Sequence, residues 1–259
     1  MKRGHTTPFM FLRAFPTMKT PDFVSAWDGF QTANHFRRAI RKFNSSPIAE
    51  DDVNALLAEA AYAPSSGNMQ PYELHWIRDP ALKTSMTAAC NGQKAAASAA
   101  EFIVVVASPA LGLRTAKAQL EHVEGSSLLG QNSKAYYRKQ VGMFQKILGL
   151  GSSALWSPLV FLAALIRPTL SLIPIGHIGG RQWAARNAIF AAQTLMLGAA
   201  AKGIDSCPME GFSASRVASL LKLPRGSVIP LVIALGYRAD DARIEEQWRQ
   251  TITELVVSH

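Results

Sequence analysis

Cysteine and charge are both scarce in this chain. Of its 259 residues only two are cysteines, Cys90 and Cys207, which are too few for a disulfide framework and lie in no spacing typical of zinc sites. We therefore expect no metal site and, most simply, a location in the reducing cytoplasm. Charged residues make up 17% of the chain and hydrophobic residues 48%, and this combination excludes intrinsic disorder.

Acidic residues are outnumbered. The chain has 27 Lys plus Arg against 18 Asp plus Glu, which gives a formal charge of +9 and favours anionic partners such as phosphates, nucleotides or a membrane surface. No basic run is longer than Arg37-Arg38, and no stripe alternates aromatic with basic residues. We therefore expect no nucleic-acid partner.

The N-terminus lacks the features of a signal peptide. Its apolar run at residues 9–12 is ended by Arg13, short of the roughly 7–15 residues that a signal peptide needs, and no A-x-A cleavage pattern follows. We expect residues 1–20 to form an N-terminal tail. Residues 21–259 are expected to form a single domain, because one hydrophobic core can serve a chain of this length.

Helical and strand-like patterns alternate along the chain, and helices dominate by length. Helices are predicted over 23–36, 50–62, 79–91, 112–146, 183–201 and 213–221, and strands over 73–77, 102–106, 204–208, 228–235 and 251–257. The continuous apolar run at 102–106 is typical of a strand buried on both faces. The helix at 183–201 is apolar on nearly every side, so we expect it in the core or at a subunit interface. The pattern predicts an α+β fold with a central mixed β-sheet flanked by helices.

Residues 109–180 form an insert that departs from this alternation. The stretch from Ile147 to Ile166 carries no charge, which is long enough in principle to cross a bilayer, but Gly149, Gly151 and Pro158 interrupt it. We favour an insert that covers a cofactor or a subunit interface. Membrane contact through about 147–175 is possible but not favoured, and a true membrane span is favoured least.

Three distant segments carry side chains suited to chemistry. RRAIRKF at 37–43 offers arginines that can bind phosphate in a bidentate manner, or is simply a solvated basic helix end. APSSGNMQP at 63–71 could grip a polar ring or sugar chain, or be a turn whose side chains cap the backbone. In SCPMEGF at 206–212, Gly211 permits close backbone approach. Cys207 has no supporting histidine motif, so we expect a small buried thiol rather than a nucleophile.

Together these segments resemble the FMN-dependent nitroreductase family. The match is carried by RRAIRKF at 37–43, AYAPSSGNMQPY at 61–72, FIVVVAS at 102–108, the helix from Asn187 to Ala201, CPMEGF at 207–212 and VIALGY at 232–237. Their order and approximate spacing also agree, over about 36–108 and 181–250, and the insert is unmatched. The resemblance implies a nitroreductase-like fold and an intertwined homodimer in which two subunits share each flavin site.

The resemblance also implies which residues contact FMN. It assigns the phosphate to Arg37 and Arg38, and the ring or ribityl chain to Arg41. The isoalloxazine and ribityl groups are assigned to Pro64, Ser65, Ser66 and Asn68, with Gln70 as a neighbour, and the pyrimidine edge to Gln93 or Asn91. Flavin N5 and O4 are assigned to Pro208, Met209, Glu210 and Gly211, with the backbone N–H groups of Glu210 and Gly211 near N5. Arg249, or else Arg243, would return to the phosphate. Ala39 stands where the family often has serine, so one phosphate contact is missing or replaced.

The implied activity is an FMN-dependent NAD(P)H oxidoreductase. Hydride would pass from NAD(P)H through flavin N5 to nitroaromatic, quinone or similar small-molecule electron acceptors by a ping-pong mechanism, and no catalytic side chain is required. Arg41 is the leading candidate to stabilise negative charge at flavin N1 and O2, and Lys94 is a weaker one. The alternatives are a specialised flavoenzyme, such as a dehalogenase or natural-product dehydrogenase, and a membrane-surface flavin-binding protein.

Overall fold

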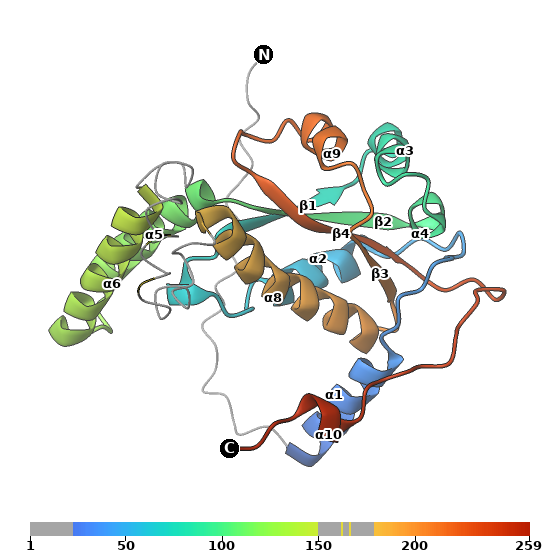
Figure 1. The fold of residues 1–259 in the computed structure, drawn as a ribbon, viewed down its shortest axis with the longest axis horizontal. Helices are drawn as coiled ribbons and strands as arrows, with labels where there is room; N and C mark the ends of the chain where they lie inside the picture. Colours follow the sequence, from blue (N-terminus) through green and yellow to red (C-terminus); the bar gives the residue numbers. More distant parts are fainter. Residues whose placement is uncertain (1–22, 150–161, 163–165, 167–178) are drawn as a thin grey trace.

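The computed structural model describes residues 23–149, 162, 166 and 179–259 of the chain. In these residues a four-stranded sheet forms in the order β1-β2-β4-β3 (Figure 1). Its strands are β1 (Tyr72–Ile77), β2 (Glu101–Ala107), β3 (Asp205–Met209) and β4 (Val228–Gly236). The α+β fold is confirmed. The sheet is antiparallel at every strand pair rather than mixed, because each strand runs opposite to its neighbours, and parallel pairing is limited to an isolated bridge between Ala39 and Ser206.

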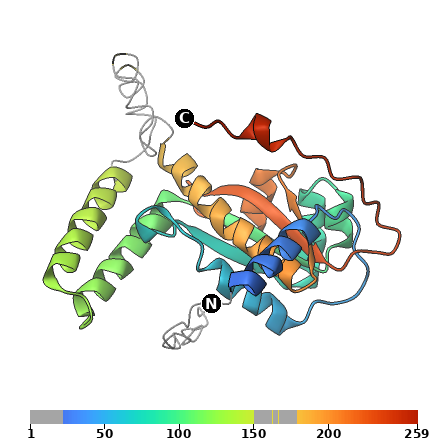
Figure 2. The ribbon, with the colours of Figure 1, turned by 90° about the horizontal axis from the view of Figure 1, so that it is seen from below.

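Helices cover both faces of the sheet (Figures 1 and 2). One face is covered by α2 (Glu50–Ala60) and α8 (Gly179–Ala201), with α1 (Phe23–Phe36) packed on α8, and the other by α3 (Pro80–Ala89), α4 (Lys94–Ser98) and α9 (Ala214–Leu220). A pair formed by α5 (Pro109–Gly125) and α6 (Gln131–Gly149) extends away from the sheet. The helix predicted over 112–146 is therefore two helices, interrupted between residues 125 and 131.

The β2 strand lies between two hydrophobic clusters, as its continuous apolar sequence predicts. Ile103 and Val105 face the cluster formed with α2 and α8, whereas Phe102, Val104 and Val106 face the cluster formed with α3, α4 and α9. Side chains alternate between the two faces of a strand, so a strand covered on both faces needs apolar residues at every position. Full burial of each such side chain contributes about 1.5–3 kcal/mol.

Two helices begin at side-chain caps, the predicted one at Asp79 and another at Ser108, where the helix starts at Pro109 rather than at the predicted residue 112. The Asp79 carboxylate accepts a hydrogen bond from the Leu82 amide at 2.7 Å at the start of α3. Ser108 caps α5 through its hydroxyl, which accepts from the Leu111 amide at 3.2 Å. In both helices proline follows the cap, where its missing N–H costs nothing.

The C-terminal strand predicted over 251–257 is wrong. Instead, the chain leaves β4 as an exposed arm that carries one short helix, α10 (Ile252–Leu255). A capping box explains the turn, because the Glu254 carboxylate accepts from the Thr251 amide at 3.1 Å. Local hydrogen bonding thus prevails over the β-branched composition of a segment that has no sheet partner within the described chain.

The tail and the uncharged stretch of the insert lie largely beyond what the structure describes. Residues 1–20, predicted as a tail, are outside the described residues, and so is nearly all of the segment considered for membrane contact, about 147–175. None of the helices in the described ranges has the length and hydropathy that a bilayer crossing requires.

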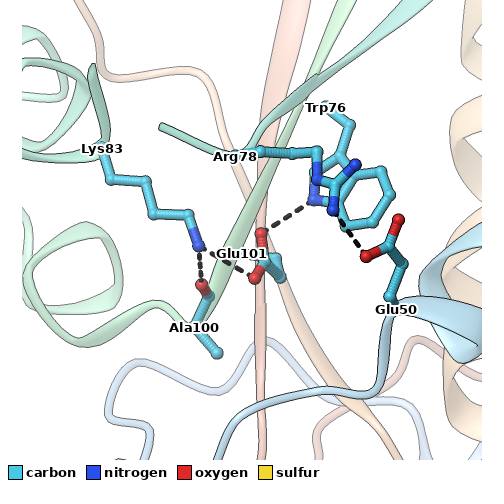
Figure 3. A network of polar contacts seen from close by, with 6 residues as sticks. All are labelled: Glu50, Trp76, Arg78, Lys83, Ala100 and Glu101. Carbon is cyan, nitrogen blue, oxygen red and sulfur yellow. Dashed lines mark hydrogen bonds and ion pairs between the residues drawn. The ribbon is translucent and has the colours of Figure 1, made fainter. Parts of the chain in front are cut away.

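A polar network ties α3 to one end of the sheet (Figure 3). The Glu101 carboxylate, at the start of β2, accepts from Trp76 Nε1 and from Lys83 Nζ, both at 2.8 Å. Lys83 Nζ also donates to the Ala100 carbonyl at 2.7 Å, and the Arg78 guanidinium lies 4.7 Å over the Trp76 ring. Ion pairs with limited solvent exposure are screened less than surface pairs. The network therefore holds α3, and the turn that follows it, in a fixed place beside the sheet.

Candidate functional site

The basic segment 37–43 runs along the outer edge of β3. The Ile40 amide donates to the Ser206 carbonyl at 3.1 Å, next to the parallel bridge between Ala39 and Ser206. Ile40 and Phe43 are buried and anchor the segment, whereas the arginines between and before them remain partly or fully exposed. The fold thus brings two segments that are far apart in the sequence, 37–43 and 206–212, to one edge of the sheet.

Two arginines of this segment have side chains without a hydrogen-bond or ion-pair partner in the described part of the chain. They are Arg37 and Arg41. By contrast, Lys42 pairs with Asp241, and Arg38 donates to the backbone carbonyl of Glu245. A guanidinium carries five N–H donors, so Arg38 keeps donors to spare. Unpaired cations beside a sheet edge suit an anionic ligand.

Cys207 lies within reach of the Arg41 charge. Burial raises the pKa of the Cys207 thiol, and the positive charge of Arg41 offsets part of that rise. The thiol therefore stays protonated near neutral pH, which agrees with the expectation of a small buried thiol rather than a nucleophile. Among the described residues, His, Cys, Asp and Glu side chains nowhere gather in a group of three that could hold a metal ion.

The backbone after β3 is held by the turn between α3 and α4. Asn91 Nδ2 and Gln93 Nε2 both donate to the Gly211 carbonyl, at 2.9 and 2.7 Å, and the Ser213 amide donates to the Ala89 carbonyl at 2.8 Å. A Cβ at position 211 would lie 3.3 Å from Gln93 Nε2, so glycine permits this close approach. The structure thus joins Gln93 to the segment 208–211, as a neighbour of its backbone.

The N–H groups of Glu210 and Gly211 remain available. Outside the strand ladder, no described acceptor receives either of them, and both residues are exposed. A flavin with an anionic phosphate requires backbone donors and positive charge, and the edge of β3 offers both, at opposite ends of the strand. The residues of this edge therefore fit the predicted cofactor by charge and by hydrogen-bonding capacity.

The hydroxyl-rich loop before β1 is a strained turn built around the 3₁₀ helix η1 (Ser66–Asn68). Gly67, Asn68 and Gln70 all have left-handed φ values, of 61°, 55° and 38°. The Ser65 hydroxyl accepts from the Gln70 amide at 3.0 Å, and Asn68 Oδ1 accepts from Gln70 Nε2 at 2.9 Å. Ser65, Asn68 and Gln70 thus cap the turn itself, whereas Pro64 and the Ser66 side chain are exposed.

This loop does not meet the basic segment within one chain. The loop precedes Tyr72, and the register across the sheet places Tyr72 level with Ala107 and with Val228 at the start of β4. The basic segment lies beside the start of β3, which is level with Gly236 at the end of β4. Val228 and Gly236 are eight residues apart on β4, roughly 26 Å at the usual rise of a strand. In addition, β1 and β3 are opposite edge strands, three strand spacings or about 14 Å apart. One chain therefore assembles two of the three segments and leaves the third at the far corner of the sheet.

The C-terminal arginines make their described side-chain contacts within the C-terminal arm. Arg249 donates to its neighbour's carbonyl, that of Trp248, at 2.7 Å, and Arg243 pairs with Glu245. The contacts that tie the arm to the basic segment are instead those of Lys42 with Asp241 and of Arg38 with the Glu245 carbonyl. A phosphate contact from Arg249 or Arg243 stays a prediction.

Asn187, for which no role was predicted, lies at the loop in the structure. Its Oδ1 accepts from the Ser66 amide at 2.7 Å, and it is almost fully buried in α8. The signal was present, because Asn187 is a polar residue within an otherwise apolar stripe, although the pattern alone does not show which backbone group it binds.

Comparisons with known proteins identify the family of the chain. The model of the nitroreductase family matches residues 35–237. An NADH dehydrogenase of Thermus thermophilus is 29% identical over 211 residues, which span 82% of this chain and 87% of that protein. MhqN of Bacillus subtilis, provisionally named an NAD(P)H nitroreductase, is 27% identical over 225 residues, spanning 86% and 95%. A protein of Exiguobacterium sibiricum, provisionally named a nitroreductase and solved in complex with FMN, superposes with a TM-score of 0.69 at 18% identity, over 89% of this chain and 97% of that one.

Proposed function

The chain belongs to the nitroreductase family, and on this ground we propose that it is an FMN-dependent NAD(P)H oxidoreductase that reduces nitroaromatic, quinone or similar small acceptors. The observation that carries the proposal is the outer edge of β3, where the segment with Arg37 and Arg41 runs along Ser206 and the exposed N–H groups of Glu210 and Gly211 follow at the end of the same strand. These groups offer positive charge and backbone donors without a nucleophile or an acid–base pair.

The chain's own residues would bind and orient the cofactor. When bound, FMN would supply the hydride chemistry between NAD(P)H and the acceptor, in two half-reactions with ping-pong kinetics. Arg37 and Arg38 would hold the phosphate, and Arg41 would stabilise negative charge on the ring, with Lys94 a weaker candidate. Glu210 and Gly211 would direct their N–H groups toward N5 and O4. Gln93 and Asn91 hold that backbone through the Gly211 carbonyl.

We further propose a homodimer in which each flavin is shared by two subunits. The loop with Pro64, Ser65, Ser66 and Asn68 is too far across the sheet from its own Arg37 to bind the same small molecule, so a partner subunit would supply it. Exposed apolar side chains support an interface on the packed pair α1 and α8. Trp27 stacks on Phe30 there with ring centroids 5.7 Å apart, and Phe190 is 52% exposed.

Steady-state kinetics test the activity. Purified protein should oxidise NADH or NADPH in the presence of a nitroaromatic or a quinone, with parallel double-reciprocal lines when both substrates are varied. Turnover that requires both substrates on the enzyme together, seen as intersecting lines, would contradict the ping-pong order. Absence of turnover with any nicotinamide, in protein that holds FMN, would favour the specialised dehalogenase or dehydrogenase.

A location in the cytoplasm is part of the proposal and has its own test. Cell fractionation at low and high salt should leave the full-length protein out of the membrane pellet. Sedimentation with membranes at low salt and release at high salt would instead favour the membrane-surface flavin-binding protein, since surface attachment by basic residues is screened by salt.

A further inference from the structure

Asn187 is a buried amide in the middle of an apolar stripe of α8. It is 3% exposed, and its neighbours on the same face, Trp183, Ala184, Ala188 and Ala191, are all buried. A polar group in such a place costs free energy unless it is hydrogen-bonded, and an alanine or leucine would serve packing alone equally well. The position therefore calls for an explanation in terms of what the amide binds.

The amide satisfies two partners of opposite kind. Its Oδ1 accepts from the Ser66 backbone N–H at 2.7 Å, and its Nδ2 donates to the Trp183 carbonyl, one helical turn earlier, at 2.8 Å. A carboxylate could serve the first partner but would set an oxygen against the Trp183 carbonyl, and an alkyl side chain could serve neither. Asparagine matches both because it carries a donor and an acceptor on one rigid plane.

The Ser66 N–H is a donor that its own loop leaves unsatisfied. It begins η1, and the first N–H groups of a helical turn have no partner within the turn. The N-cap residue, Ser65, cannot serve this amide, because an N-cap side chain reaches the second or third N–H of the turn, and the Ser65 hydroxyl accepts from the Gln70 amide. Asn187 thus supplies the acceptor for the Ser66 N–H, from a helix 121 residues later in the chain.

The rest of the loop needs external support as well. Left-handed residues that are not glycine, here Asn68 and Gln70, cost free energy and persist only where surrounding contacts hold them. Gln119 of α5 donates to the Gly67 carbonyl at 3.2 Å. A Cβ at position 67 would come within 2.6 Å of the Phe144 ring in α6, so this side is closed. Asn187 supports the loop from α8, through its hydrogen bond to the backbone of Ser66.

We propose that Asn187 is the positioning residue of the loop 64–68. By fixing the backbone of Ser66, it sets the direction in which Pro64 and the Ser66 hydroxyl leave the surface. The inference rests on the proposed function in one respect, because that function makes the same loop a contact of the flavin. Asn187 itself, being buried, touches the loop and not the cofactor.

The test compares Asn187→Asp and Asn187→Leu in the full chain, with a change at an exposed residue of α9, Ser219→Leu, as the control. Aspartate keeps the acceptor for Ser66 but buries a charge, whereas leucine keeps the packing and removes the acceptor. Three quantities are measured: the hydrogen-exchange rate of the Ser66 amide, the Kd for FMN, and the melting temperature.

We expect the Asn187→Leu variant to exchange the Ser66 amide at least roughly tenfold faster and to bind FMN roughly tenfold more weakly than the wild type. The Asn187→Asp variant should stay within roughly threefold of the wild type in both, although it melts at the lower temperature of the two. The Ser219→Leu variant should match the wild type throughout.

Two results would overturn the inference. One is an unchanged Ser66 exchange rate in Asn187→Leu, and the other is an FMN affinity that falls in step with the melting temperature, so that aspartate is the worse variant. A wild-type chain that takes up no FMN would overturn the proposed function instead, and the Ser66 exchange rates would still decide the role of Asn187.

Discussion

Gln93 Nε2 lies 2.7 Å from the carbonyl oxygen of Gly211, and together they join the turn after α3 to the backbone that follows β3. Asn91 Nδ2 donates to the same oxygen at 2.9 Å, so one acceptor is held by two amides. If this pair fixes the N–H groups of Glu210 and Gly211, either amide alone should partly suffice.

A double-mutant cycle at Asn91 and Gln93 is therefore expected to be non-additive. Each single change to alanine should raise the Kd for FMN by less than about threefold, because one donor remains, whereas the double variant should raise it by about tenfold or more. Fluorescence titration of FMN measures all four Kd values. Changes that simply multiply would show that the two amides act independently of a shared acceptor.

Replacing the unpaired arginines should weaken FMN binding without unfolding the chain. Arg37→Ala and Arg41→Ala each remove a charge that has no ion-pair partner among the described residues, so melting temperatures should hardly change. Loss of a charge-assisted contact should raise the Kd by roughly 10–100-fold. Arg216→Ala, an exposed change on α9, is the control. Equal affinity in the variants and the control would leave Arg37 and Arg41 as ordinary surface charges.

Asp205 and Arg238 should matter for stability rather than for binding. The Asp205 carboxylate is 3% exposed and accepts from Arg238 Nη2 at 2.6 Å and from Nε and the backbone amide of Arg238 at 2.9 Å each. Arg238→Ala leaves that carboxylate buried without its counter-charge, which should cost about 3–5 kcal/mol in the free energy of unfolding. Urea denaturation gives the value, and a loss below about 1 kcal/mol would mean that solvent replaces the arginine.

Cys90 should make stability fall at alkaline pH. Burial raises the pKa of its thiol from 9.0 to about 11 in the folded chain. The folded state therefore holds this proton more tightly than the unfolded state, and the resulting stability is complete below about pH 9 and is lost as the pH rises toward 11. Other groups titrate in the same range, so the measured quantity is the difference between the wild type and Cys90→Ala. That difference should shrink from pH 9 to 11, and a constant difference would refute the shift.

The shared site can be tested by mixing two defective chains. One carries Arg37→Ala with Arg41→Ala, and the other carries Ser66→Ala with Asn187→Leu. If each flavin is bound by the basic segment of one subunit and the loop of the other, a mixed dimer has one site with both halves intact and one with neither. Random pairing of equal amounts makes half of the dimers mixed, so mixing should restore about a quarter of the wild-type FMN binding. Binding that stays at the level of the separate chains would indicate that one chain forms the whole site.

Much of the fold follows from local sequence. The bounds of α1, Phe23–Phe36, were predictable from its periodicity, and the uninterrupted apolar run of β2 identified a strand covered on both faces. The start of α3 followed from Asp79-Pro80, a cap and a preformed first turn. These features depend on near neighbours, so sequence contains them.

Features that depend on distant contacts were missed. The antiparallel order β1-β2-β4-β3 sets the loop at Ser65 and the segment at Arg37 on opposite edges, and no local pattern reports strand order. For the same reason the partners of Asn187 and Gln93 could not be read from the sequence, because Ser66 and Gly211 are more than a hundred residues away from them. The strand expected over 251–257 failed because the β-branched residues there have no neighbouring strand within the described chain, while a capping box favours a helical turn.

The central claim is that this chain folds into an FMN site, and the visible absorption spectrum of the purified protein tests it most directly. The account predicts a yellow protein that releases about one FMN per chain on denaturation. A colourless protein that takes up no FMN when the cofactor is added would contradict it.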